Sequence, residues 1–297
     1  MMGRPLQEVS PPRAGEPAAR REPWRWGWTG LGSWLLGMLL LALALPARAE
    51  VAVLVPGYLG GPQDWRTSGV VGTLGRAGWR DGGDLGMRGG AVDRGSRPVP
   101  AARTLYTVAL PTEAPLGLQA QVLARYLAAV RAWHPGEGLV LIGHSAGGVV
   151  ARLYMVQNPD GGVGALISIA SPHLGTEAAE VGAMLGQTPL AWFAPLVGAG
   201  TLNRSQGLYR DLMREDPRGI LFWLNRQPHP SATYVSIVRA EDSVGLGDLV
   251  VPSWSQDLNN IPALRGRAVR IPVADGHGLG PQDGDVLLEV LEGLRRS

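Results

Sequence analysis

Lysine and cysteine are both absent from this sequence of 297 residues. The absence of cysteine excludes disulfide bonds, thiolate metal sites and a cysteine nucleophile. The absence of lysine excludes a Walker-type phosphate loop, because that motif requires a lysine beside its glycines. All 27 basic residues are therefore arginines. The apolar content of 45% and the charged content of 18% are typical of a globular protein with a hydrophobic core.

The first 49 residues differ in composition from the rest. A cluster of arginines at positions 20–25 precedes the apolar run Leu35–Leu45, and a short segment with small residues ends at Ala49. This order is typical of a secretory signal peptide. The run is shorter than the roughly 20 residues that span a bilayer, although it reaches 17 residues when it is extended back to Thr29. We therefore expect cleavage after Ala49 and export to a periplasm, a lumen or the cell exterior, with an uncleaved membrane anchor as the alternative.

The predicted leader also holds the positive charge of the chain. Its six arginines and three glutamates give it a net charge of +3, whereas the whole chain has a formal charge of +2. Residues 50–297 therefore carry a net charge of −1. Nucleic-acid binding requires a basic patch or stripe, so no nucleic-acid partner is expected.

Alternating strand and helix patterns fill residues 50–297, which we predict to form one α/β domain. Short runs that are apolar on both faces predict buried strands of a mostly parallel central sheet. Apolar residues at spacings of three and four predict helices over 118–133 and 286–294, and a helix is also expected over 148–157. Such alternation predicts helices on both faces of the sheet. The predicted strands are residues 51–55, 105–109, 139–142, 165–170, 234–238 and 268–273.

Two segments interrupt this alternation. In the first, residues 57–103, a helix is expected over 67–79 and a long glycine-rich loop over 81–100. The second, residues 176–231, is an apolar insert between two predicted strands. It forms either ordinary core helices or a helical cap over an apolar site, and the sequence leaves both open.

The segment Gly143-His144-Ser145-Ala146-Gly147 matches the pattern G-x-S-x-G. A predicted buried strand precedes it and a predicted helix follows it, which is the context of a nucleophile elbow. In such a turn, a side chain at either flanking glycine would collide with the neighbouring strand or helix. We therefore predict that Ser145 is held outward as a nucleophile.

A serine nucleophile needs a base, which is usually a histidine oriented by a carboxylate. On this type of sheet the chain order is serine, acid, histidine. Of the three histidines that follow Ser145, His173 directly follows a predicted strand, and His229 lies between two prolines in a predicted surface turn. His277 follows the last predicted strand and has glycines on both sides. We predict His277 to be the base.

The acid lies between Ser145 and His277 in this chain order. The candidates are Asp242, Asp248 and Asp257, and spacing alone does not separate Asp242 from Asp248. Asp275 lies in the loop of the histidine itself, where we expect it to shape the turn.

Five motifs occur in the order seen in α/β-hydrolases, and the chain resembles the small secreted bacterial lipases and esterases of that superfamily. The resemblance spans nearly all of residues 50–297, although no motif covers the loop after residue 61 or the insert. The motifs are VLVPGYLGG at 53–61, GHSAG at 143–147, SPHLG at 171–175, DLVVP at 248–252 and GHG at 276–278.

This resemblance implies roles for further residues. The triad acid in the family is the aspartate before a short apolar run, which here is Asp248. The oxyanion-hole amides would belong to Tyr58 or Leu59 and to Ala146. His173 falls in a segment that is structural in these lipases. The chain departs from the family where Pro56 replaces the histidine of a His-Gly pair, which leaves open the choice between Tyr58 and Leu59, because proline has no amide hydrogen and a fixed φ.

We therefore expect a serine hydrolase that cleaves carboxylic esters, with an acyl chain lodged under the insert. Its partners would be ester or lipid substrates, the apolar insert leaves open contact with a membrane or lipid interface, and no cofactor or metal is expected. Two alternatives remain open. The same three side chains serve an acyltransferase, and a hydrolase fold also serves non-catalytic binding proteins because fold alone does not determine function.

Overall fold

The computed structural model describes residues 50–95, 101–179, 200–214, 216–240 and 247–296. The predicted leader (residues 1–49), part of the predicted insert and the alternative acid Asp242 lie outside the described residues. Among the residues that are described, no helix is both long enough and apolar enough to cross a membrane.

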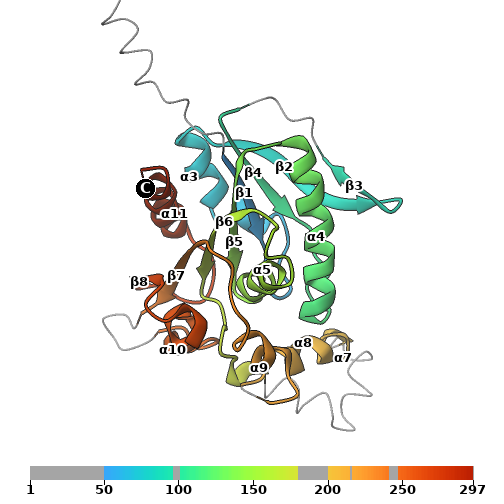
Figure 1. The fold of residues 1–297 in the computed structure, drawn as a ribbon, viewed down its shortest axis with the longest axis vertical. Helices are drawn as coiled ribbons and strands as arrows, with labels where there is room; N and C mark the ends of the chain where they lie inside the picture. The colour runs from blue at the N-terminus through green and yellow to red at the C-terminus, as the bar shows by residue number, and fades with distance from the viewer. Residues whose placement is uncertain (1–49, 96–100, 180–199, 215, 241–246, 297) are drawn as a thin grey trace, which may run out of the picture. The chain divides into compact units, whose positions relative to one another are not determined.

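The described residues build one sheet of eight strands in the order β3-β2-β4-β1-β5-β6-β7-β8 (Figure 1). Neighbouring strands run parallel, except for the antiparallel pair β2 and β3. The prediction of a mostly parallel central sheet is confirmed. The strands are β1 (Glu50–Val55), β2 (Arg80–Arg88), β3 (Ala91–Arg94), β4 (Arg103–Val108), β5 (Gly138–His144), β6 (Val163–Ile169), β7 (Thr233–Arg239) and β8 (Ala268–Val273).

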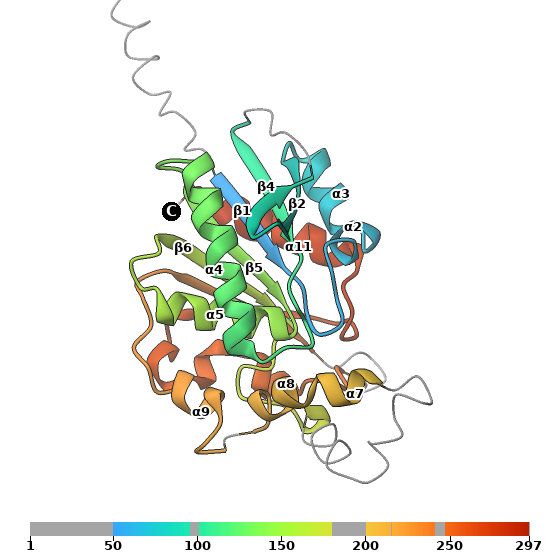
Figure 2. The same cartoon turned by 90° about the vertical axis from the view of Figure 1, so that its right-hand side faces the viewer.

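Helices cover both faces of the sheet, as predicted. Helices α4 (Leu116–Trp133) and α5 (Ala146–Gln157) lie on one face, and α3 (Val70–Arg76) and α11 (Pro281–Leu294) lie on the other (Figures 1 and 2). The shorter helices are α2 (Asp64–Thr67), α7 (Gly200–Arg204), α8 (Gln206–Asp211), α9 (Ile220–Leu224), α10 (Ser253–Gln256) and the 3₁₀ turns η3 (Leu258–Asn260) and η4 (Pro262–Leu264).

Strand β1 shows why such a sheet requires apolar residues on both faces. Its alternate residues Val51, Val53 and Val55 pack in the core with α4 and α5, whereas Ala52 and Leu54 pack in the core with α3 and α11. Each of these side chains is at most 1% exposed. A strand buried on both sides therefore appears in the sequence as a continuous apolar run.

The predicted loop over residues 81–100 is wrong over residues 81–94, where β2 and β3 form a hairpin. Gly89 and Gly90 make the connection with φ values of 58° and 84°, a region that non-glycine residues rarely adopt. Gly82 lies within β2, and a Cβ atom there would lie 2.4 Å from the ring of Tyr106. The glycines of this strand thus allow close packing while removing its apolar sequence signal.

Helix α4 begins two residues before its predicted start and buries most of its predicted apolar face, with Leu118 as the exception. Leu118 is 48% exposed, whereas Gln119 is 1% exposed and donates a hydrogen bond of 2.7 Å to the carbonyl oxygen of Ala114. Because its amide group is hydrogen-bonded, Gln119 can be buried at a small cost in free energy.

The described part of the insert contributes to the main core. Leu208 of α8 and Leu221 and Leu224 of α9 are buried in the same cluster as α4 and α5. Polar contacts also fix α8, because the Asp211 carboxylate accepts a hydrogen bond of 2.7 Å from the amide of Leu116. Helices α8 and α9 of the insert therefore pack into the same core as α4 and α5.

Candidate active site

Ser145 occupies a strained turn between β5 and α5. Its φ and ψ angles are 51° and −128°, and a positive φ at a residue other than glycine stores strain that the surrounding structure must impose. The amide of Ser145 donates a hydrogen bond of 2.8 Å to the carbonyl oxygen of Ile169 on the next strand. The serine backbone is thus held at the carboxyl end of the sheet.

The glycines on either side of the serine permit close backbone approach. A Cβ atom on Gly143 would lie 2.4 Å from the Cα of Gly148 in helix α5, and one on Gly147 would lie 2.4 Å from the carbonyl oxygens of Val55 and Pro56 after β1. Both distances are shorter than any real contact of a Cβ atom. The structure thus shows both collisions that the sequence predicted. A side chain at Gly143 would collide with helix α5, and one at Gly147 would collide with the backbone at the end of strand β1.

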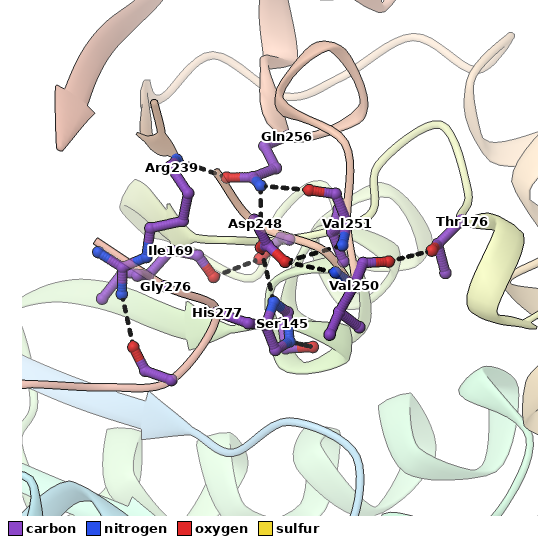
Figure 3. Close-up of polar contacts among 12 residues, drawn as sticks. Ser145, Ile169, Thr176, Arg239, Asp248, Val250, Val251, Gln256, Gly276 and His277 are labelled. Atoms are coloured by element: carbon purple, nitrogen blue, oxygen red, sulfur yellow. Dashed lines mark hydrogen bonds and ion pairs between the residues drawn. The ribbon is translucent and has the colours of Figure 1, made fainter. Parts of the chain in front are cut away.

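The structure brings Ser145, His277 and Asp248 together (Figure 3). His277 Nε2 lies 2.9 Å from Ser145 Oγ, and His277 Nδ1 lies 2.7 Å from Asp248 Oδ2. A carboxylate only accepts hydrogen bonds, so His277 Nδ1 carries the proton and donates it. Its unprotonated Nε2 then accepts the hydrogen bond of the serine hydroxyl, which is the tautomer that a general base requires.

Asp248 is bound from several sides. Its Oδ1 accepts hydrogen bonds of 2.8 and 2.9 Å from the amides of Val250 and Val251, and its Oδ2 accepts one of 3.0 Å from Gln256 Nε2 in addition to that from His277. Its side chain is fully buried. Burial by itself raises the pKa of this carboxyl, but the hydrogen bonds from His277 and the two amides outweigh it, so the pKa is lowered and the group is a carboxylate at neutral pH.

His144, the residue before the serine, supports the histidine loop. Its Nε2 donates a hydrogen bond of 2.8 Å to the carbonyl oxygen of His277. Its ring meets that of Trp65 edge to face, with 6.5 Å between the centroids. Burial lowers the pKa of His144 to about 4, so its imidazole is neutral at physiological pH.

Two of the three predicted oxyanion residues lie beside the serine. Ala146 begins α5, and the first N–H groups of a helix have no acceptor within the helix. Tyr58 and Ala146 line the same cavity as Ser145, whereas Leu59 is 60% exposed and lines a different cavity. A Cβ atom on Gly57 would lie 2.8 Å from the Cβ of Ser145, so the loop that carries Tyr58 passes directly against the serine.

A cavity of about 320 Å³ opens at the serine. Helix α8 of the insert forms one wall, and the Tyr209 hydroxyl of this helix lies 2.6 Å from that of Tyr58. Most of its lining is apolar. The lining residues include Tyr58, Ser145, Ala146, Pro172, Ala178, Ala179, Leu208, Leu212, Val250 and Val251.

The other candidate residues from the sequence lie elsewhere. His173 is completely buried. The surface turn predicted for His229 is wrong, because this residue is 8% exposed, donates from Nδ1 to the carbonyl oxygen of Gln227 and packs against Tyr234. Asp257 accepts a hydrogen bond from the amide of Asn259 at the start of η3.

Two residues that the sequence did not indicate also contact the candidate site. Gln256 binds the carboxylate of Asp248, and Tyr209 closes one side of the cavity with Tyr58. Neither belongs to a motif, so only their proximity in the folded chain identifies them. Asp275, in contrast, accepts a hydrogen bond from the amide of Gly276, in keeping with the turn-shaping part expected of it. Among the described residues, no group of three or more histidine, aspartate or glutamate side chains could hold a metal ion.

A parallel sheet with a serine turn at its centre and a histidine after its last strand defines the class of α/β-hydrolase folds. A family model described as the PGAP1-like alpha/beta domain matches residues 120–193, about a quarter of the chain, which includes the serine turn. A comparison with curated protein sequences found no match.

Solved structures share this fold. The mature lipase BlEst2 of Bacillus licheniformis is 15% identical, with a TM-score of 0.53 over 84% of this chain and 93% of that one. The product of the gene lin2722 of Listeria innocua is 14% identical, with a TM-score of 0.51 over 83% and 91%. The metagenomic carboxyl esterase MGS0156 is 14% identical, with a TM-score of 0.51 over 84% and 76%. The chain therefore has the α/β-hydrolase fold, as the sequence motifs implied.

Proposed function

We propose that this protein is a serine hydrolase that cleaves carboxylic esters through an acyl-enzyme. The observation that carries the proposal is the chain of two hydrogen bonds from Ser145 through His277 to Asp248. The lipase and the carboxyl esterase among the structures that share the fold support the same reaction class.

In the proposed reaction, His277 Nε2 takes the proton of Ser145 Oγ while that oxygen bonds to the ester carbonyl carbon. The displaced electron pair forms an oxyanion, which the amides of Ala146 and Tyr58 stabilise. Losing one such donor typically costs about 3–4 kcal/mol of transition-state stabilisation. His277 then gives its proton to the alcohol oxygen as the carbon–oxygen bond breaks, and a water molecule repeats the sequence to release the acid.

The proposed acyl site is the cavity beside the serine. Its walls from α8 and from the loop 248–251 are mainly apolar, and apolar side chains around a few polar groups are typical of small-molecule sites. Lipid esters are therefore the proposed substrate class. Residues 1–49 are proposed to direct export, and an exported protein that begins at residue 50 on N-terminal sequencing would support this.

Replacing the nucleophile gives the decisive test. We expect Ser145→Ala to lower kcat/KM for p-nitrophenyl esters by up to about 10⁶-fold, because the three side chains act as a unit. Esters from acetate to palmitate should be compared, because the preferred chain length separates an esterase from a lipase. Ser168→Ala is the matched control, because Ser168 is a buried serine on the neighbouring strand β6 and donates only to a backbone carbonyl.

Full activity in Ser145→Ala would overturn the proposal. A fluorophosphonate probe should label the wild-type protein and the Ser168→Ala control but not Ser145→Ala. Absence of labelling in folded wild-type protein would favour a non-catalytic binding protein. Ester products formed in the presence of glycerol would instead favour acyl transfer.

A further inference from the structure

Gln256 is the last residue of α10 and lies next to Asp248 in the candidate site. Its Nε2 donates hydrogen bonds of 3.0 Å to Asp248 Oδ2 and 2.7 Å to the carbonyl oxygen of Val251. Its Oε1 accepts a hydrogen bond of 2.8 Å from the backbone amide of Arg239. The residue is 1% exposed. All the hydrogen-bonding groups of this buried amide are thus used, and Figure 3 shows it on the side of Asp248 away from Ser145.

Arg239 links Gln256 to the loop that carries His277. Its guanidinium pairs with Asp283 of α11 through contacts of 2.7 and 2.9 Å, and both side chains are completely buried. The same guanidinium donates a hydrogen bond of 2.9 Å to the carbonyl oxygen of Gly278, next to His277. Asp283 in turn accepts one of 2.9 Å from the amide of Gly280.

These contacts close a ring around the acid and the base. The ring runs from Asp248 to Gln256, from Gln256 to Arg239, from Arg239 to Gly278, and back through His277 to Asp248. Asp248 Oδ2 therefore has two donors, and Arg239 is bound both to Gln256 and to the loop of His277. Removing the Gln256 donor would leave this oxygen with His277 alone, although the Oδ1 atom would keep its two amides.

We propose that Gln256 is a positioning residue that fixes Asp248 Oδ2 opposite His277 Nδ1. This inference rests on the proposed hydrolase function and deepens it. Gln256 touches neither Ser145 nor the cavity at the serine. Its effect is therefore on the orientation of His277, and through it on the rate of the chemical step.

The charged groups around Asp248 and His277 must be known before a pH profile of the activity can be interpreted. Asp248 and His277 are faced by His144 from β5, Arg239 from β7 and Asp283 from α11. A change at Gln256 replaces none of these three side chains, and its one direct effect on them is that methionine removes the acceptor of the Arg239 backbone amide. Removing a donor from Asp248 Oδ2 alters the carboxylate that binds His277 Nδ1, so the acid limb of the pH profile should move.

The test compares Gln256→Met and Gln256→Glu with the wild-type full-length chain on p-nitrophenyl esters. Methionine keeps the length of the side chain but loses both amide groups. Glutamate keeps the acceptor for the Arg239 amide, and it donates to Asp248 Oδ2 only in its protonated form, which burial beside a second carboxylate favours. Gln119→Met is the matched control, because Gln119 is equally buried and donates to the carbonyl oxygen of Ala114.

We expect Gln256→Met to lower kcat by about 10- to 100-fold, the size of effect that misplacement of a reacting group produces. Gln256→Glu should lower kcat less, because its protonated form still donates to Asp248. KM should stay within about twofold, because ground-state binding is not altered. The acid limb of kcat/KM should move in Gln256→Met and stay in place in Gln119→Met. A purely structural role would lower the melting temperature without moving this limb. A wild-type kcat and pH profile in Gln256→Met would overturn the proposal.

A second readout is independent of turnover. The proton between His277 Nδ1 and Asp248 should give a low-field resonance in the proton NMR spectrum of the wild-type protein, which should shift or broaden in Gln256→Met. An unchanged resonance would overturn the positioning role even if the protein has no esterase activity. A shifted resonance in a protein without esterase activity would instead contradict only the proposed function.

Discussion

Two arginines are buried to the same extent in this protein but in very different surroundings. Arg239 pairs with Asp283 and binds the loop of His277. Arg152 of α5 is also completely buried, yet no carboxylate pairs with it among the described residues. Its Nη2 donates a hydrogen bond of 2.6 Å to Asn225 Oδ1. Burial lowers the pKa of Arg152 to about 9.

The neighbours of Arg152 are kept uncharged. Burial first, and the charge of Arg152 second, lower the pKa of His173 well below its usual range and the pKa of His229 to about 4. The region behind the candidate site thus compensates a buried cation with an anion. The region around α5 instead surrounds its cation with neutral groups, which makes that region sensitive to protonation.

The ion pair of Arg239 gives the largest expected effect. Asp283→Asn should lower the free energy of unfolding by about 3–5 kcal/mol, because it leaves a buried guanidinium without its carboxylate. Urea denaturation measures this loss. Asp216→Asn is the control, because Asp216 pairs with Arg218, whose side chain is 90% exposed, and such surface pairs contribute little to stability. Equal losses in the two variants would contradict the comparison.

Acid should affect the Arg152 region next. The folded-state pKa of His229 is about 4, below its value in an unfolded chain, so the unfolded chain binds more protons between about pH 6.5 and pH 4. The free energy of unfolding therefore falls as the pH falls through this window. At pH 5 this one histidine should cost about 2 kcal/mol. Urea denaturation of His229→Gln at pH 7 and pH 5 should show a smaller difference than the wild type; parallel curves would contradict the prediction.

Removing the unpaired cation should have the smallest effect. Arg152→Met should lower the free energy of unfolding by about 1 kcal/mol at pH 7, the contribution of its hydrogen bond to Asn225, because no buried charge is left behind. Urea denaturation beside Asp283→Asn compares the two regions directly. A loss as large as that of Asp283→Asn would show that Arg152 is better compensated than its contacts indicate.

The sequence predicted those parts of the fold and site that depend on local sterics and chain order. The continuous apolar run of β1 and the glycines around Ser145 each have one physical cause, and that cause acts over a few neighbouring residues. His277 followed from its position after the last predicted strand. Asp248 could be separated from Asp242 only through the family resemblance, because spacing does not say which carboxylate reaches a histidine.

The remaining features depend on contacts between distant segments. Glycines hide strand β2 from any apolar pattern, since Gly82 is there to accommodate the ring of Tyr106. Prolines around His229 indicated a surface turn, but the residue packs against Tyr234. In the sequence, nothing distinguishes Gln256 from other polar residues, because its contacts with Asp248 and Arg239 exist only after α10 has packed against β7.

The closed ring behind the candidate site also has a consequence for the order of synthesis. Ser145 and the histidine that accepts its hydrogen bond are 132 residues apart, and Asp283, which holds the histidine loop, comes later still. A ribosome therefore completes the strained serine turn long before it makes the residues that give the serine a base. The nascent chain carries an unassisted hydroxyl until helix α11 has been made and has packed against the sheet.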